Sequence, residues 1–158
     1  MKIINRLASI LFVLLMIVVI PLSVPKVFGF SIYNVLSDSM EPTILTGSLI
    51  YVKAVDTQTL KPQDIISFYA KSNTIVTHRI TNIEDNSITT KGDYNKDIDL
   101  TKLNPSNIIG KVMFSIPILG YIYEIFGNIG GMTGLFVVLL FIMLLWLYSY
   151  NKEKKIDG

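Results

Sequence analysis

The segment Ser37-Asp38-Ser39-Met40-Glu41-Pro42 places two serine hydroxyls close to a proline. The proline ring fixes φ of Pro42 at about −65° and disfavours a helical conformation at the residue before it. We therefore expect the chain to turn sharply after Ser39 and to leave its hydroxyl exposed, as a nucleophile requires. The alternative is that Ser37 and Asp38 only cap a turn, which is a common role for these residue types.

A serine nucleophile needs a base that takes its proton, and the chain contains a single histidine, His78. Alternation with a period of two places His78 on the same strand face as Val76 and Ile80. Such a position suits a neutral imidazole that acts as a general base. It suits equally a core histidine that has no catalytic role, so the pattern alone does not separate the two interpretations.

A third group is needed to orient the imidazole and to stabilise its charged form. Three carboxylates follow the fourth predicted strand within a short run, at Asp93, Asp97 and Asp99. Two alternatives are a solvated turn and a calcium loop of alternating oxygen ligands. The calcium loop is disfavoured because its pattern needs a glycine at the sixth position and a glutamate at the twelfth. Counted from the first of these aspartates, those positions hold Ile98 and Asn104.

The elements that must position these side chains are predicted to be strands. Five runs are rich in β-branched or alternating residues and are separated by glycine, proline or polar turns: Ser48–Val55, Asp64–Tyr69, Thr74–Ile83, Ser87–Thr90 and Ile108–Phe114. Glu84-Asp85-Asn86 is a plausible hairpin turn between the third and fourth runs. Because no helical pattern of 10–15 residues separates the runs, a small antiparallel sheet or partial barrel is expected rather than a parallel sheet.

Composition narrows the classes of function. The chain has 158 residues, of which 51% are hydrophobic, a formal net charge of +2 and no cysteine. Such a small charge does not indicate a nucleic-acid partner. The lack of cysteine excludes disulfides, thiolate metal sites and cysteine nucleophiles. The hydrophobic excess lies at the two ends, so one domain of about 100 residues is expected between two anchors.

Two uncharged stretches predict transmembrane helices. Residues 7–25 include an apolar run from Ile10 to Ile20 and can just cross a hydrocarbon core of about 30 Å. Residues 125–151 form the second stretch, with aromatic residues toward its end. A cleaved signal peptide is the alternative for the first stretch. No small-x-small cleavage site follows directly behind its apolar core, which favours an anchor.

Lysine and arginine flank both stretches on their terminal sides, so the positive-inside rule places both termini in the cytoplasm. The expected organisation has five parts: a cytoplasmic N-terminus (1–6), a transmembrane helix (7–25), an extracytoplasmic β-domain (26–128), a second transmembrane helix (129–149) and a cytoplasmic tail (150–158). Before the second helix, the apolar run from Met113 to Phe126 contains Pro117 and Gly120 and is too broken to span a membrane. It is either a surface that dips into lipid headgroups or an ordinary buried strand and turn.

Taken together, these segments resemble the membrane-bound type I signal peptidases, and in particular their endoplasmic-reticulum-type branch, shared by eukaryotes, archaea and some Gram-positive bacteria. The resemblance spans about residues 34–124 and keeps the order of the family's motifs. The matching segments are Ser37–Pro42, Gly47–Val52, Asp64–Phe68, Thr77–Ile80, Lys91–Asn95 together with Asp99, and Gly110–Tyr121. The branch is indicated by His78, because the commoner bacterial enzymes carry a lysine base at that position.

The resemblance implies roles for the acidic residues. An aspartate six residues after the Gly-Asp pair completes the catalytic group of this branch, and counting from Asp93 gives Asp99. Asp97 is a rival for that role, since the loop length differs between members. Asp93 itself is implied to be required for the architecture of the site.

The resemblance also implies a mechanism in which Ser39 attacks and His78 acts as the base. The Ser37 hydroxyl would help the Ser39 backbone N–H to hold the oxyanion. The implied function is that of a membrane-bound serine endopeptidase, which removes signal peptides from secreted preproteins and cuts after small residues (Ala-x-Ala). No metal or other cofactor is implied. The expected partners are preproteins and the lipid bilayer, and a secretion translocon could be a further one.

Two rival functions belong to other classes. A non-enzymatic, membrane-anchored β-domain could act as a scaffold in an envelope complex, but it would not need Ser39, His78 and Asp99 in these motifs. A self-processing serine peptidase of the repressor type has a related fold, but it uses a lysine base and lacks two membrane anchors.

Overall fold

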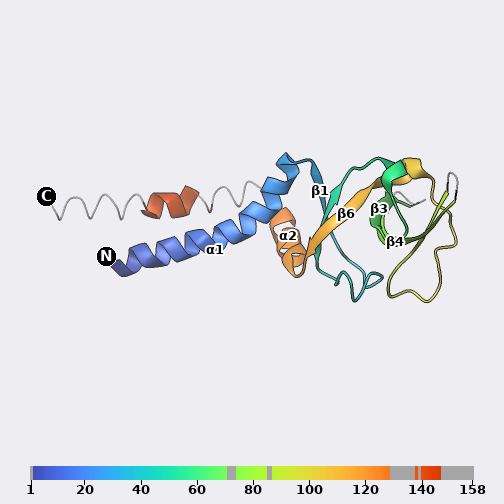
Figure 1. The fold of residues 1–158 in the computed structure, drawn as a ribbon. Coiled ribbons are helices and arrows are strands. Elements are labelled where there is room, and N and C mark those ends of the chain that lie inside the picture. The colour runs from blue at the N-terminus through green and yellow to red at the C-terminus, as the bar shows by residue number, and fades with distance from the viewer. Residues whose placement is uncertain (1, 71–73, 85–86, 129–137, 139, 147–158) are drawn as a thin grey trace. The chain divides into compact units, whose positions relative to one another are not determined.

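The computed structural model describes residues 2–70, 74–84, 87–128, 138 and 140–146 (Figure 1). The chain divides into two compact units. One is residues 25–123, and the other combines residues 1–24 with 124–158. The candidate chemistry lies entirely in the first unit, which contains the β-sheet.

Six antiparallel strands form this sheet: β1 (Phe30–Asn34), β2 (Leu49–Lys53), β3 (Ile65–Tyr69), β4 (Ile75–Glu84), β5 (Ser87–Lys91) and β6 (Ile108–Ile116). Their order is β1-β2-β6-β3-β4-β5, so the sheet is open, with β1 and β5 at its edges (Figure 1). Two short 3₁₀ turns, η1 (Thr57–Thr59) and η2 (Pro105–Asn107), lie in the connections. The expectation of a mainly β fold with a small antiparallel sheet is confirmed.

All five predicted strands form, with ends that shift by one or two residues. The first strand, β1, was not predicted. It has only five residues and directly follows an apolar helix, so its own alternation is too short to recognise. Its long-range pairing with β2, from Phe30 opposite Lys53 to Asn34 opposite Leu49, stabilises it.

Two buried clusters make up the core. One contains six buried residues: Leu60, Ile66, Phe68, Ile80, Ile88 and Leu103. The other joins Met40 and Ile44, which follow the Ser37–Ser39 segment, to Ile50 and Val52 of β2. The second cluster thus anchors the predicted nucleophile turn, because a residue next to Ser39 is part of the core.

Two interpretations were open for the run from Met113 to Phe126, and the structure does not match one of them, an ordinary buried strand and turn. Strand β6 continues to Ile116, and helix α2 (Leu119–Asn128) follows. The helix was missed because Pro117 and Gly120 suggested a broken segment, although both lie before or within its first turn. Met113 is 51% exposed and Ile118 is 68% exposed, so this stretch is not uniformly buried. Contact with lipid headgroups remains a prediction.

The N-terminal stretch forms helix α1 (Lys2–Val27), which extends beyond the predicted span at both ends. Within the described residues, one helix is long and apolar enough to cross a membrane, namely Ser9–Val27. A signal sequence at this position would pass the same test. The second predicted span, residues 129–149, lies largely outside the described residues.

Candidate active site

Ser39 lies in a turn that is fixed in place by its buried neighbour, Met40. Its neighbour Met40 is 2% exposed, and Met40 O accepts a hydrogen bond of 2.9 Å from Ile44 N. The burial of Met40 fixes the backbone at Ser39 while Ser39 itself stays only partly buried. Ser37 Oγ lies 3.3 Å from Ser39 Oγ, so the two hydroxyls share a hydrogen bond. Both candidate hydroxyls therefore occupy one local site.

The turn that follows β5, which is distant in the sequence, also supports the backbone of Ser39. Tyr94 N donates a hydrogen bond of 2.9 Å to Ser39 O. A Cβ atom on Gly92 would lie only 2.6 Å from the same carbonyl oxygen. The close approach requires glycine at position 92, because the atom in the way belongs to the backbone.

His78 lies on β4 and is 8% exposed, as its alternation with Val76 and Ile80 predicted. Its Nδ1 atom lies 2.7 Å from Asp99 Oδ2. The ring of Phe68 meets the imidazole edge-on, with centroids 6.3 Å apart. The imidazole is thus held by a carboxylate at one nitrogen and by an aromatic ring at its side, which leaves Nε2 as the nitrogen that can accept a proton.

The acidic residues after β5 take different partners. Both oxygens of Asp93 bind Arg79, through Nε at 2.8 Å and Nη2 at 2.6 Å. Arg79 also donates to Gln63 O at 2.9 Å. The hydrogen bond from Arg79 lowers the pKa of Asp93 below its ordinary value, against the opposing effect of burial. Asp93 therefore joins β4 to the loop after β5 and does not share the partner of Asp99.

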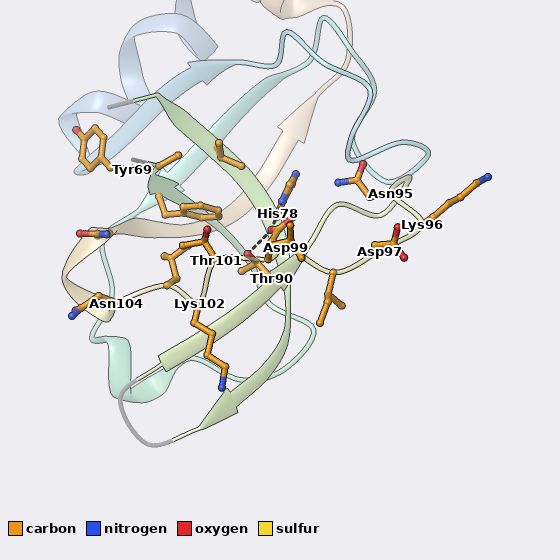
Figure 2. A pocket seen from close by; sticks show the side chains of 17 residues that line it. Tyr69, His78, Thr90, Asn95, Lys96, Asp97, Asp99, Thr101, Lys102 and Asn104 are labelled. Atoms are coloured by element: carbon orange, nitrogen blue, oxygen red, sulfur yellow. Dashed lines mark hydrogen bonds and ion pairs between the residues drawn. The ribbon is translucent and has the colours of Figure 1, made fainter. Parts of the chain in front are cut away.

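Asp97, the rival of Asp99, is exposed and points away from His78 (Figure 2). It lies in the same loop as Asp99, so the length of the loop alone would have allowed either residue. The structure brings only one of the two carboxylates to the imidazole.

A cavity of about 480 Å³ brings Ser37, Ser39 and His78 together. Its lining comes from residues 33–37, 39–40 and 74–78, with Ile44, Ile50 and Asn95 completing it. Most of these side chains are apolar, and the hydroxyls and the imidazole are the groups able to do chemistry. Ser39 and His78 are 39 positions apart in the sequence, and it is the fold that places both in the lining of one cavity.

A second cavity, of about 910 Å³, lies on the side of His78 that carries Asp99 (Figure 2). His78, Thr90 and Asp99 are all among its lining residues. Thr90 donates a hydrogen bond of 2.6 Å from its hydroxyl to Asp99 Oδ2. Thr90 could not be singled out from the sequence, since a threonine within a strand is common and its partner lies nine positions ahead.

The arrangement can perform nucleophilic acyl transfer, with a hydroxyl, an imidazole and a carboxylate in that order. Among the residues that the structure describes, no group of three or more His, Asp and Glu side chains could hold a metal ion.

Comparisons with known proteins identify the family of the chain. Residues 4–102 match the family model described as signal peptidase, peptidase S26. The curated protein "Signal peptidase I W" of Bacillus subtilis (strain 168) is 43% identical to the chain over 89 residues. That alignment covers 53% of this chain and 47% of the relative. The chain therefore spans about half the length of the curated relative that it matches.

Proposed function

Because this chain belongs to the signal peptidase family, peptidase S26, we propose that it is a membrane-bound serine endopeptidase that removes signal peptides from secreted preproteins. One observation carries the proposal. Ser39 and His78 line the same cavity, and His78 is hydrogen-bonded to Asp99. All three residues lie within the segment that matches the family. A non-enzymatic scaffold is not favoured, because it gives no reason for this arrangement.

In the proposed mechanism, the Ser39 hydroxyl attacks the carbonyl carbon of the scissile peptide bond. His78 takes the hydroxyl proton at Nε2, since Nδ1 is bound to Asp99, and passes it to the leaving amine. Water then releases the acyl-enzyme with the same base. Asp99 holds the ring in the required tautomer and stabilises the imidazolium.

The oxyanion that forms during attack needs hydrogen-bond donors. We assign this role to the Ser39 backbone N–H and the Ser37 hydroxyl. Ser37 Oγ lies 3.3 Å from the nucleophile oxygen, a position from which it can reach the same carbonyl group. A donor of this kind is typically worth about 3 kcal/mol of transition-state stabilisation.

The substrate is proposed to bind as an extended strand in the 480 Å³ cavity. The pairing of β4 with β5 begins at Arg79, so within the described residues the segment Ile75–His78 pairs with β3 alone. The opposite wall, Tyr33–Ser37, continues an edge strand. An extended peptide can add to such an edge through backbone hydrogen bonds. The apolar lining suits the small side chains of an Ala-x-Ala motif.

The anchors are proposed to keep the site near the leaflet where signal peptides end. Residues 7–25 and 129–149 would span the membrane, with residues 26–128 outside and both termini in the cytoplasm. Helix α1 supports the first span by its length and composition. Preproteins are the proposed partners, together with lipid and a secretion translocon that delivers them.

The proposal predicts that Ser39→Ala and Asp99→Asn both lose preprotein cleavage. Ser39→Ala removes the nucleophile and should reduce kcat/KM by a factor of at least about a thousand. Asp99→Asn no longer holds the imidazole in the required tautomer and should also reduce kcat/KM strongly. The measurement is cleavage of a preprotein by the full chain in lipid, read as loss of the precursor band.

Two matched variants serve as controls. Ser31→Ala removes an exposed serine on β1 that does not line the cavity. Asp97→Asn changes the neighbouring exposed carboxylate of the same loop. Both should retain activity, and all four variants should unfold at similar urea concentrations. Full cleavage by Ser39→Ala would end the proposal, and a larger loss in Asp97→Asn than in Asp99→Asn would reverse the assignment of the orienting acid.

A further inference from the structure

Thr90, on β5, makes two hydrogen bonds to Asp99. Its hydroxyl donates to Asp99 Oδ2 at 2.6 Å, and its backbone oxygen accepts from Asp99 N at 2.9 Å. Thr90 is fully buried, with an exposed fraction of 0%. Both the backbone and the carboxylate of Asp99 are therefore tied to one buried residue of the sheet.

The carboxylate oxygen that binds Thr90 is the one that binds the imidazole. Asp99 Oδ2 lies 2.6 Å from Thr90 Oγ1 and 2.7 Å from His78 Nδ1. An ionised carboxylate only accepts hydrogen bonds, so both partners must act as donors toward this oxygen. This geometry requires the proton on Nδ1 of the neutral imidazole and leaves the lone pair on Nε2.

Asp99 would not be held firmly without this contact. It lies in the loop after β5, its side chain is 25% exposed, and it lines the 910 Å³ cavity (Figure 2). A carboxylate that faces such a cavity can rotate and bind water in place of the imidazole. The Thr90 hydroxyl opposes that rotation because it donates a hydrogen bond to Oδ2, the oxygen that also binds His78.

We propose that Thr90 is a positioning residue that acts through Asp99 to hold His78 in the Nδ1–H tautomer with Nε2 free for the Ser39 proton. The inference rests on the proposed function for its effect on cleavage. The effect of Thr90 on the tautomer of His78 does not depend on that function and can be measured without cleavage. Thr90 does not touch substrate or the reacting atoms, and its hydroxyl does no proton transfer.

The first test compares Thr90→Val with Thr90→Ser in preprotein cleavage by the full chain. Valine keeps the branched shape and removes the hydroxyl, whereas serine keeps the hydroxyl and removes the methyl. Thr90→Val should lower kcat/KM by roughly 10- to 100-fold, as expected for the loss of one hydrogen bond to a charged group. Thr90→Ser should stay within about threefold of the unmodified chain on the same reasoning.

Thr81→Val is the matched control, because Thr81 Oγ1 donates to Thr89 O at 3.1 Å on the neighbouring strand. It loses a threonine hydroxyl bond of the same sheet without changing a bond to Asp99, and should keep its activity. If Thr90→Val fails to fold, Thr90→Ser and Thr90→Ala replace it as the comparison. Both variants remove the methyl group of Thr90, and they differ from each other only in the hydroxyl.

The second test reads the imidazole itself. The chain has one histidine, so ¹⁵N-histidine labelling gives ring signals from His78 alone. At a pH where the ring is neutral, the full chain in detergent should show mainly the Nδ1–H tautomer. Thr90→Val should increase the share of the Nε2–H tautomer, whereas Thr90→Ser and Thr81→Val should not.

The outcomes separate the two proposals. If Ser39→Ala abolishes cleavage but Thr90→Val retains both full activity and the unchanged tautomer signals, the positioning role of Thr90 is wrong and the proposed function stands. If Ser39→Ala retains cleavage, the proposed function is wrong, and the tautomer signals still decide whether Thr90 positions His78. Equal loss of activity in Thr90→Val and Thr90→Ser with unchanged signals would also overturn the inference, because it shows only a packing role.

Discussion

Asp93 and Asp99 lie on one loop but bind side chains on opposite faces of β4. His78 and Arg79 are consecutive strand residues, so their side chains point to opposite sides of the sheet. Asp99 binds the first and Asp93 binds the second. Two carboxylates of one acidic run therefore divide into one that meets the candidate base and one that ties the loop to the strand.

The ion pair of Asp93 predicts a pH-dependent contribution to stability. The pKa of Asp93 is lowered in the folded protein by Arg79, so the pair stabilises the fold above the ordinary carboxyl pKa of 3.8. That contribution is lost as the pH falls through the lower, folded-state value. Asp93→Asn should reduce the free energy of unfolding by about 2 kcal/mol at pH 7, as for a hydrogen bond to a charged group.

Urea unfolding of the full chain in detergent, at pH 7 and pH 3, measures this effect. The difference between the unmodified chain and Asp93→Asn should shrink at pH 3. That pH lies below the ordinary carboxyl pKa of 3.8, so Asp93 takes up a proton more readily in the unfolded state than in the folded state, which favours unfolding. A difference that is equally large at both pH values would contradict the assignment to this ion pair.

At the scale of elements, β5 and the turn that follows it position three parts of the site. Thr90 holds Asp99, Tyr94 N holds the Ser39 carbonyl, and Gly92 allows the close approach between them. The edge strand is therefore more than a boundary of the sheet. It relates the turn that contains Ser39 to the carboxylate that binds His78.

Gly92→Ala tests this arrangement. The added Cβ would lie 2.6 Å from Ser39 O, so one of the two backbone segments must move. We expect a loss of stability of about 1–3 kcal/mol, as for other overpacking changes. Displacement of Ser39 by a fraction of an ångström should also lower kcat/KM by a factor of ten or more, on the order of the effects seen for misplaced reacting groups.

Gly29→Ala is the matched control for that substitution. Gly29 has φ of +78°, but nothing lies within 4 Å of an added Cβ. The variant should lose about 1 kcal/mol of stability from the left-handed conformation while cleavage stays unchanged. Equal losses of activity in the two glycine variants would show that general destabilisation, and not the position of Ser39, explains the result.

At the scale of the whole molecule, the site belongs to the unit of residues 25–123, whereas the proposed anchors belong largely to the other unit. The sheet and its two core clusters can account for the geometry of the site without the anchors. The anchors are proposed to hold the site at the membrane surface, where it would encounter signal peptides.

The proposed topology can be tested with thiol labelling because the chain has no cysteine. Gln58→Cys introduces a thiol at an exposed position of the sheet unit, and Lys154→Cys introduces one in the predicted cytoplasmic tail. A membrane-impermeant maleimide should label the first variant in intact cells and the second only after permeabilisation. Labelling of Lys154→Cys in intact cells would contradict two spans with both termini inside.

Much of the sheet could be predicted from local patterns. Period-two alternation and turn residues located the five strands that have a strong pattern of their own. Strand β1 and helix α2 could not be found in this way, because β1 depends on pairing with β2 and α2 begins among residues that usually break helices. Both elements have partners that are distant in the sequence: β1 pairs with β2, and Gly120 N of α2 donates a hydrogen bond to Gly47 O.

The sequence by itself determined the residue types available for catalysis: one histidine, no cysteine, a serine before a proline-fixed turn and an acidic run. Only the tertiary structure decided which of these groups meet. It brought His78 to Asp99 and left Asp97 exposed, and it added Thr90, whose hydroxyl has no recognisable signal in the chain. The physical reason is that hydrogen bonds of 2.6 to 2.7 Å depend on strand register and loop path, which are set by burial across the whole sheet.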